Sequence, residues 1–164
     1  MKNTIISEWI AVTDFKCDVT KKFFKYQDLF VAWYEKSVVN ETGTIVYQDR
    51  FMLVSQEFGF EILQNITDDN WTLNALPLEN ILNENVILFF TNLLVIDSIH
   101  DKGNLDKVTN LKSWTDLFRR LTIRNYEQAR HRLKEALQMD EFIELTEYQL
   151  LQASNLDKFI KNLD

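Results

Sequence analysis

The sequence predicts a mainly helical protein, and two features of the 164-residue chain support this prediction. The chain holds three glycines and one proline, whereas sandwiches and barrels need many turns rich in these residues. Apolar residues also recur at spacings of three and four along most of the chain, as in amphipathic helices. We therefore expect a single helical domain, residues 1–164, folded as an irregular bundle of about six helices.

The first predicted helix covers residues 18–38, with Asp18 as its N-cap. Its apolar side chains follow helical spacing, namely Val19, Phe23, Tyr26, Phe30 and Trp33. The segment "NETG" at 40–43 is then expected to form a turn.

Residues 44–66 fit two patterns. Partial alternation of apolar residues predicts a short strand or hairpin near 44–54, at Ile45, Tyr47, Phe51 and Leu53. A longer helical stripe runs through Tyr47, Phe51, Val54, Phe58 and Ile62, and we prefer the helix because its pattern is longer. Gly59 weakens this interpretation, since glycine inside a helix costs about 1 kcal/mol relative to alanine.

The second half of the chain shows helical patterns throughout. Residues 78–100 carry apolar side chains on every side between Val86 and Phe90, which predicts a helix in the middle of the core. Capping-box signals predict two further helix starts, at Asn125 with Gln128 and at Thr146 with Gln149. An amphipathic helix before them is predicted from Leu111, Trp114, Leu117, Phe118 and Leu121, and a last one from Tyr148, Leu151, Leu156, Phe159 and Leu163.

The net charge of −7 is concentrated in one part of the chain. Residues 1–50 and residues 111–164 are each neutral overall, whereas residues 51–110 carry nine acidic and two basic side chains. No Lys or Arg lies between Arg50 and Lys102. A field of one sign attracts a basic partner, and an aromatic residue beside acids can anchor an interface. The expected partner-binding residues are Glu57, Glu61, Asp68, Asp69, Trp71, Glu79 and Glu84.

The chemistry of enzymes and metal sites finds little support. Two histidines and one cysteine give no zinc spacing, and the chain holds no glycine-rich phosphate loop and no nucleophile elbow. We therefore expect no cofactor and no catalytic activity. The start of the chain does not resemble a signal peptide, and the most apolar segment, 86–99, is too short to span a bilayer. These features favour a cytoplasmic protein that does not enter the membrane.

A basic segment at 112–134 offers an alternative function. Its two predicted helices have the outline of a helix-turn-helix and would make the chain a nucleic-acid-binding regulator. Acidic residues follow directly in 135–147 and could pair with this segment, and nucleic-acid-binding domains are usually basic overall. We therefore do not expect nucleic acid as the partner. The arginines concerned are Arg119, Arg120, Arg124, Arg130 and Arg132.

In general character the chain resembles bacterial immunity proteins, which neutralise a cognate toxin and include those of contact-dependent growth inhibition systems. The resemblance lies in a small, acidic, aromatic-rich and glycine-poor chain without catalytic motifs. It implies a basic toxin as partner, an RNase or DNase whose active site the acidic surface would occlude. A scaffold that binds some other basic protein remains a third interpretation.

Overall fold

The computed structural model describes residues 7–41, 43–83, 86–92, 104–108 and 110–163. They belong to two compact units, Met1–Phe118 and Arg119–Asp164. The described residues form both helices and strands, a mixed α/β composition. The prediction of a mainly helical bundle is therefore wrong.

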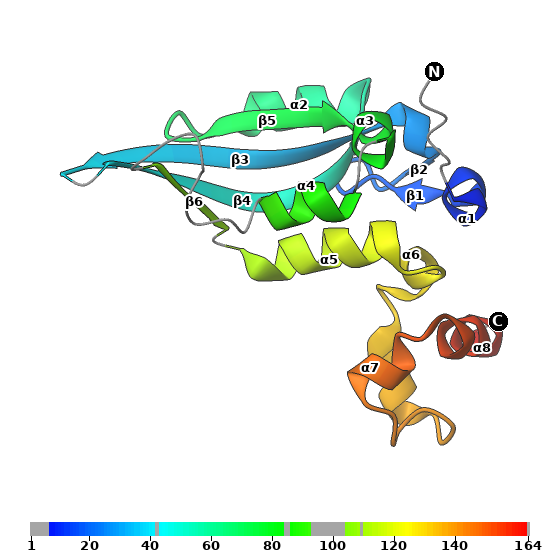
Figure 1. The fold of residues 1–164 in the computed structure, drawn as a ribbon. Coiled ribbons are helices and arrows are strands. Elements are labelled where there is room, and N and C mark those ends of the chain that lie inside the picture. Colours follow the sequence, from blue (N-terminus) through cyan, green and yellow to red (C-terminus); the bar gives the residue numbers. More distant parts are fainter. Residues whose placement is uncertain (1–6, 42, 84–85, 93–103, 109, 164) are drawn as a thin grey trace. The chain divides into compact units, whose positions relative to one another are not determined.

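A four-stranded sheet dominates the N-terminal unit (Figure 1). Its strand order is β5-β3-β4-β6, in which β3 pairs antiparallel with both neighbours and β6 pairs parallel with β4. The bounds are β3 Leu29–Asn40, β4 Gly43–Ser55, β5 Thr72–Pro77 and β6 Asn104–Val108. A small antiparallel pair precedes the sheet, formed by β1 Phe15–Lys16 and β2 Phe23–Phe24.

Helices pack on both faces of this sheet. On one face, Phe60 of α2 contacts Phe30 of β3 with ring centroids 5.5 Å apart. On the other face, Phe89 of α4 lies 6.1 Å from Trp33 of β3, as expected for side chains an odd number of residues apart on one strand. The helices of this unit are α1 Glu8–Val12, a 3₁₀ turn Tyr26–Asp28, α2 Phe58–Ile66, α3 Leu78–Asn83, α4 Val86–Asn92 and the larger part of α5 Leu111–Thr122.

The predicted helix 18–38 is wrong, because most of this segment belongs to β2, the 3₁₀ turn and β3. Strand β3 lies between two other strands, and its residues Val31 to Tyr34 are buried at four consecutive positions. A strand covered on both faces has no polar alternation, and a continuous apolar run also contains residues three and four apart. Asp18 is not a helix cap either; its Oδ2 accepts a hydrogen bond of 2.8 Å from the backbone N–H of Leu53.

The preferred helix over 44–66 is wrong in its first half and right in its second. The alternative strand near 44–54 is confirmed, since β4 covers Gly43–Ser55. Helix α2 then begins at Phe58. The turn at "NETG" is confirmed by the pairing of Asn40 with Gly43 at the end of the β3–β4 hairpin.

The helical prediction for 78–100 is confirmed for α3 and α4, and residues 84–85 and 93–100 lie outside the described part of the chain. Helix α4 is not buried on every side as predicted, because Ile87 and Leu88 are each more than half exposed. In the described ranges, no helix is both long enough and apolar enough to cross a membrane.

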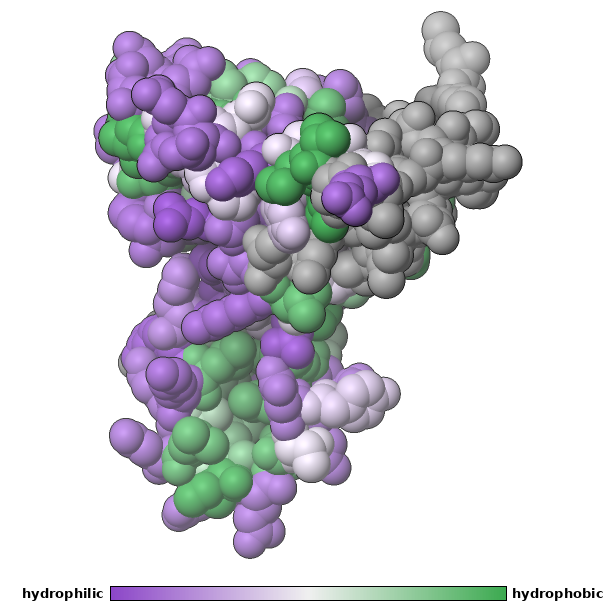
Figure 2. Space-filling view, turned by 90° about the vertical axis from the view of Figure 1, so that its left-hand side faces the viewer, coloured by the Kyte–Doolittle hydropathy of each residue, from purple (hydrophilic) through white to green (hydrophobic). Residues whose placement is uncertain are grey.

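The C-terminal unit consists of short helices around a core of its own. Its elements after α5 are α6 Tyr126–Ala129, a 3₁₀ helix Leu133–Gln138, α7 Glu147–Leu150 and α8 Ala153–Leu163. The core consists of Tyr126, Ala129, Ala136, Phe142, Leu156 and Phe159. Apolar side chains also gather on one surface of this unit (Figure 2). Leu137 and Ile143 are among the exposed apolar residues of the unit.

The two predicted capping boxes have different outcomes. Thr146 forms the expected box with Gln149, whose backbone N–H donates to the threonine hydroxyl over 3.3 Å. Asn125 precedes helix α6 as predicted but makes no capping hydrogen bond, because its backbone is left-handed with a φ of 69°. The predicted last helix is interrupted between α7 and α8.

Candidate partner-binding surface and pocket

A β-bulge in β4 shapes one side of the sheet. Ala32 pairs with Met52 and Tyr34 pairs with Asp49, so two residues, Arg50 and Phe51, lie opposite Trp33. Arg50 adopts a left-handed backbone with a φ of 57°, which is uncommon for a residue other than glycine. Its N–H donates to Oδ1 of Asp49 over 2.8 Å. A bulge of this kind changes the direction of side chains and often lies next to a functional site. The surroundings of Arg50 are therefore a candidate site.

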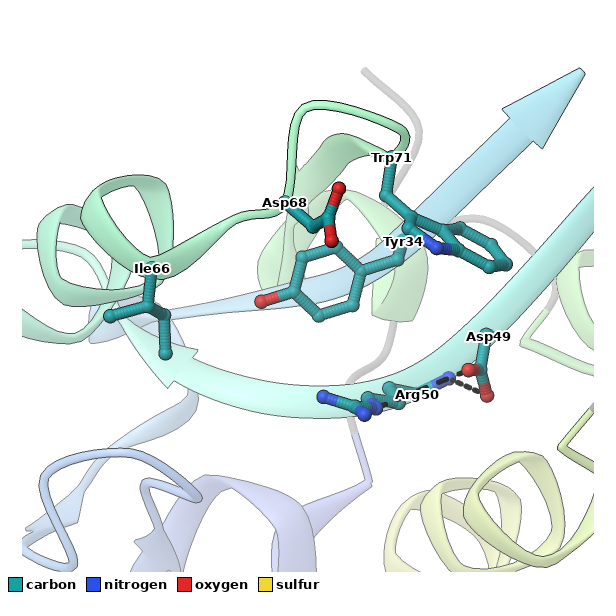
Figure 3. A pocket seen from close by; sticks show the side chains of 6 residues that line it. All are labelled: Tyr34, Asp49, Arg50, Ile66, Asp68 and Trp71. Atoms are coloured by element: carbon teal, nitrogen blue, oxygen red, sulfur yellow. Dashed lines mark hydrogen bonds and ion pairs between the residues drawn. The ribbon is translucent and has the colours of Figure 1, made fainter.

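An open pocket of about 330 Å³ lies at this bulge (Figure 3). Its lining comes from strands β3 and β4, the last residue of α2 and the loop that leads to β5. Figure 3 shows two aromatic rings, two carboxylates, one guanidinium and one aliphatic side chain around it. These residues are Tyr34, Asp49, Arg50, Ile66, Asp68 and Trp71.

The two aromatic rings of the pocket already interact with cations of the same unit. The guanidinium carbon of Arg50 lies 5.9 Å from the ring centre of Tyr34. The ammonium nitrogen of Lys36 lies 5.9 Å from the ring centre of Trp71. Both distances fall within the range of cation–π attraction, so the pocket suits positively charged groups.

Asp68 lies at the pocket, where hydrogen bonds from Asn70 favour its ionised form. Its Oδ1 accepts hydrogen bonds from the backbone N–H and the side-chain amide of Asn70, each 2.9 Å long. These bonds, with a smaller contribution from the charge of Lys36, lower the pKa of Asp68 below its usual value. Trp71 follows in the same turn, and its backbone N–H donates to the backbone carbonyl of Asp68 over 2.9 Å.

Helix α2 presents an apolar stripe to solvent next to this pocket. Phe58, Ile62 and Ile66 are spaced four residues apart and are 63%, 43% and 68% exposed. The adjoining side of the helix buries Gly59 and Leu63. A helix in a monomeric protein usually turns such a stripe inward, and an exposed stripe beside polar residues is typical of interaction sites.

The start of α2 fits tightly against β4. A methyl group at Gly59 would lie 2.6 Å from Val54 Cγ1 and 2.8 Å from Ser55 Oγ, so the glycine is required by packing. The N–H of Gly59 donates to Ser55 Oγ over 2.9 Å, and the buried Cys17 sulfur accepts from the Ser55 N–H over 3.3 Å. Gly59 weakened the helical prediction from the sequence. In the structure, the absence of a side chain at Gly59 allows α2 to pack closely against β4.

The predicted partner-binding residues lie on several elements of the N-terminal unit. Asp68 and Trp71 line the pocket, and Asp69 is exposed beside them. Glu57 and Glu61 are exposed on or just before α2, and Glu79 is exposed on α3. Glu84 lies outside the described residues. Within the described ranges, none of the five placed carboxylates forms a salt bridge with a basic side chain.

Sequence reasoning did not identify the remaining pocket residues or the apolar stripe of α2. The missed pocket residues come from strands β3 and β4 and from helix α2, which are brought together only in the folded chain; they are Tyr34, Asp49, Arg50 and Ile66. The adjacent charges Asp49 and Arg50 in the middle of an apolar strand were a visible signal of an irregularity. Phe58 and Ile62 belong to the predicted helical stripe, but the sequence did not indicate that they are exposed.

The arginines of the basic segment are largely engaged within the C-terminal unit. Nε and Nη2 of Arg120 donate to the carboxylate of Glu127 over 2.7 and 2.9 Å, and both side chains are almost completely buried. Arg119 pairs with Glu147 at 2.7 Å, and Arg132 pairs with Glu135 at 2.9 Å. This geometry corresponds to the local pairing considered as the alternative to nucleic-acid binding.

Comparison of the chain with protein-family models, curated proteins and solved structures finds no match. In the described part of the chain, no group of three or more His, Cys, Asp or Glu side chains is arranged to hold a metal ion.

Proposed function

We propose that the chain is an immunity protein that binds a basic protein toxin and blocks it. The main support for this function is the surface of α2, where Phe58, Ile62 and Ile66 are exposed beside Glu57 and Glu61. Apolar side chains that remove water from an interface provide affinity. Unpaired carboxylates around them select a partner of opposite charge and speed the encounter.

A nuclease is the toxin class that this chemistry suits best. Nuclease active sites bind phosphate groups with basic side chains, and exposed carboxylates can take the place of those phosphates. The proposed mechanism is occlusion of the active site, and it needs no catalytic group on this chain. Because such a toxin would act on nucleic acid inside the cell, the proposal places the chain in the cytoplasm.

Direct binding of nucleic acid by the basic segment is less well supported. The salt bridges of Arg119, Arg120 and Arg132 use their guanidinium groups within the chain, and a nucleic-acid site needs such groups for phosphates.

The proposed function predicts that charge reversal on α2 slows binding to the toxin. The partner for this test is a basic nuclease domain recovered by pull-down with the intact chain. For Glu57→Lys combined with Glu61→Lys, we expect an association rate about tenfold lower at low salt, because long-range attraction becomes repulsion. We also expect a weaker dependence on salt, because salt screens that attraction. Stopped-flow measurements at two ionic strengths provide both quantities.

The matched control places the same two reversals in the C-terminal unit, as Asp140→Lys with Glu144→Lys. Both residues are exposed, so the total change in charge is equal and only its location differs. Equal slowing by both variants would show that net charge, and not the α2 surface, governs the encounter. An unchanged association rate for the α2 variant would contradict the proposal directly.

A further inference from the structure

We propose that the pocket at the β4 bulge receives one arginine side chain of the basic partner. This inference rests on the proposed function, since it names the group that the partner inserts. The pocket combines two aromatic rings, Tyr34 and Trp71, with two carboxylates, Asp49 and Asp68 (Figure 3). Its volume of about 330 Å³ is in the range of pockets that hold small ligands, and one side chain fits into it.

The rings and carboxylates together favour guanidinium over ammonium. A guanidinium is planar and weakly hydrated, stacks on aromatic faces and donates parallel N–H groups to a carboxylate, whereas an ammonium acts as a compact, strongly hydrated charge. The chain itself shows the stacking mode, because the guanidinium of Arg50 lies over Tyr34. An incoming arginine would therefore meet surfaces that already accommodate this group.

Asp68 supplies the acceptor for the incoming group. Both of its hydrogen bonds from Asn70 end on Oδ1. Its other oxygen, Oδ2, accepts no hydrogen bond from the described residues. The neighbouring Asp69 is also exposed but does not line the pocket. A comparison of Asp68 with Asp69 therefore distinguishes a carboxylate that can accept hydrogen bonds in the pocket from one that contributes only to the negative potential of the surface.

Arg50 is the competitor of the incoming arginine. It covers Tyr34, lies 4.0 Å from the Asp49 carboxylate and adopts a backbone conformation that glycine favours. Arg50→Gly removes the competing cation and suits the left-handed backbone. This substitution should leave the bulge intact and increase the affinity of the pocket for a cation.

The test titrates the intact protein with Nα-acetyl-arginine amide and follows the indole signal of Trp71 by NMR. A probe of this size binds with a dissociation constant on the order of millimolar. We expect a saturating shift with the arginine probe and roughly fivefold weaker binding of Nα-acetyl-lysine amide. Asp68→Asn should weaken arginine binding about fivefold, because the amide keeps the Oδ1 acceptor for Asn70 but loses the charge. Arg50→Gly should strengthen binding about threefold or more, because a like charge is removed.

The control is Asp69→Asn, which changes the same charge one residue away and should leave the affinity for the arginine probe unchanged. Equal losses for Asp68→Asn and Asp69→Asn, equal affinity for both probes, or no shift of the Trp71 signal would each overturn the proposal. The titration contains no toxin, so its failure leaves the binding role of α2 intact. Conversely, normal arginine binding together with unaltered toxin association in the α2 variant would contradict the proposed function alone.

Discussion

Three arginines of the C-terminal unit form salt bridges with glutamates of the same unit, whereas the carboxylates of the N-terminal unit between residues 57 and 79 are exposed. The buried pair of Arg120 and Glu127 is the clearest case in the first unit, with side chains 1% and 2% exposed. Glu57 and Glu61 represent the second, since both are exposed and neither forms a salt bridge with a described residue. The same chemical groups therefore stabilise one unit and remain accessible on the other.

Apolar exposure alone does not separate the two units. The C-terminal unit exposes Leu137 and Ile143, and apolar side chains gather on one surface of it (Figure 2). On α2, the exposed apolar stripe lies beside two carboxylates that form no salt bridge with a described residue, and its last residue, Ile66, lines the pocket at the bulge. Charge pairing within each unit therefore adds information on accessible charges that net charge and hydrophobicity do not give separately.

The largest expected effect is the loss of the buried ion pair in the C-terminal unit. Arg120→Met should destabilise this unit by about 3–5 kcal/mol, because Glu127 is left charged and buried without its partner. Urea denaturation followed by circular dichroism measures this change. Lys161→Ala is the control, since its pair with Asp157 is exposed and should contribute about 0.5 kcal/mol or less.

The double variant Arg120→Met with Glu127→Leu distinguishes pairing from packing. It should recover most of the lost stability, because apolar residues of similar size often replace a buried pair without cost. If the single variant unfolds no more easily than the Lys161 control, the Arg120–Glu127 pair is not a structural element, and the contrast between the units fails.

An intermediate effect is expected on the α2 surface, and on binding rather than folding. Phe58→Ser should lower the affinity for the toxin roughly thirtyfold, which corresponds to about 2 kcal/mol and is typical of an interface anchor. The free energy of unfolding should change by less than about 0.5 kcal/mol, because the ring is 63% exposed. Calorimetric titration and thermal denaturation give the two quantities.

Val39→Ser is the matched control for Phe58→Ser. Val39 lies on β3 in the same unit and is 79% exposed, so its replacement should leave the affinity unchanged. A strong loss of stability in Phe58→Ser would place this ring in the core and contradict its assignment to an interface.

The smallest expected effect concerns the capping box of α7. Thr146→Ala should destabilise the C-terminal unit by about 1 kcal/mol, because the N–H of Gln149 loses its acceptor. Association with the toxin should not change, since the residue belongs to the unit whose polar groups serve folding. Thr146→Ser, which keeps the hydroxyl, should retain nearly native stability. A change in the association rate with unchanged stability would show that the C-terminal unit also contributes to toxin binding.

Local interactions explain the parts of the fold that the sequence predicted. The turn at 40–43, helix α5 and the capping box of Thr146 and Gln149 each depend on residues at most a few positions apart. The location of the excess negative charge is also a property of the sequence alone. The predicted partner-binding carboxylates among the described residues are exposed, namely Glu57, Glu61, Asp68, Asp69 and Glu79. Their role in binding stays a prediction.

Non-local strand pairing decided the rest. The pattern around Phe30 and Trp33 fits a helix and a strand equally well, and only the pairing of β3 with β4 and β5 selects the strand. The same pairing opens the bulge at Arg50 and brings Tyr34, Asp68 and Trp71 to one pocket. Strand register depends on partners far along the chain. The sequence by itself determined the location of the charges and the capping box of Thr146 and Gln149, and the tertiary structure decided which side chains meet.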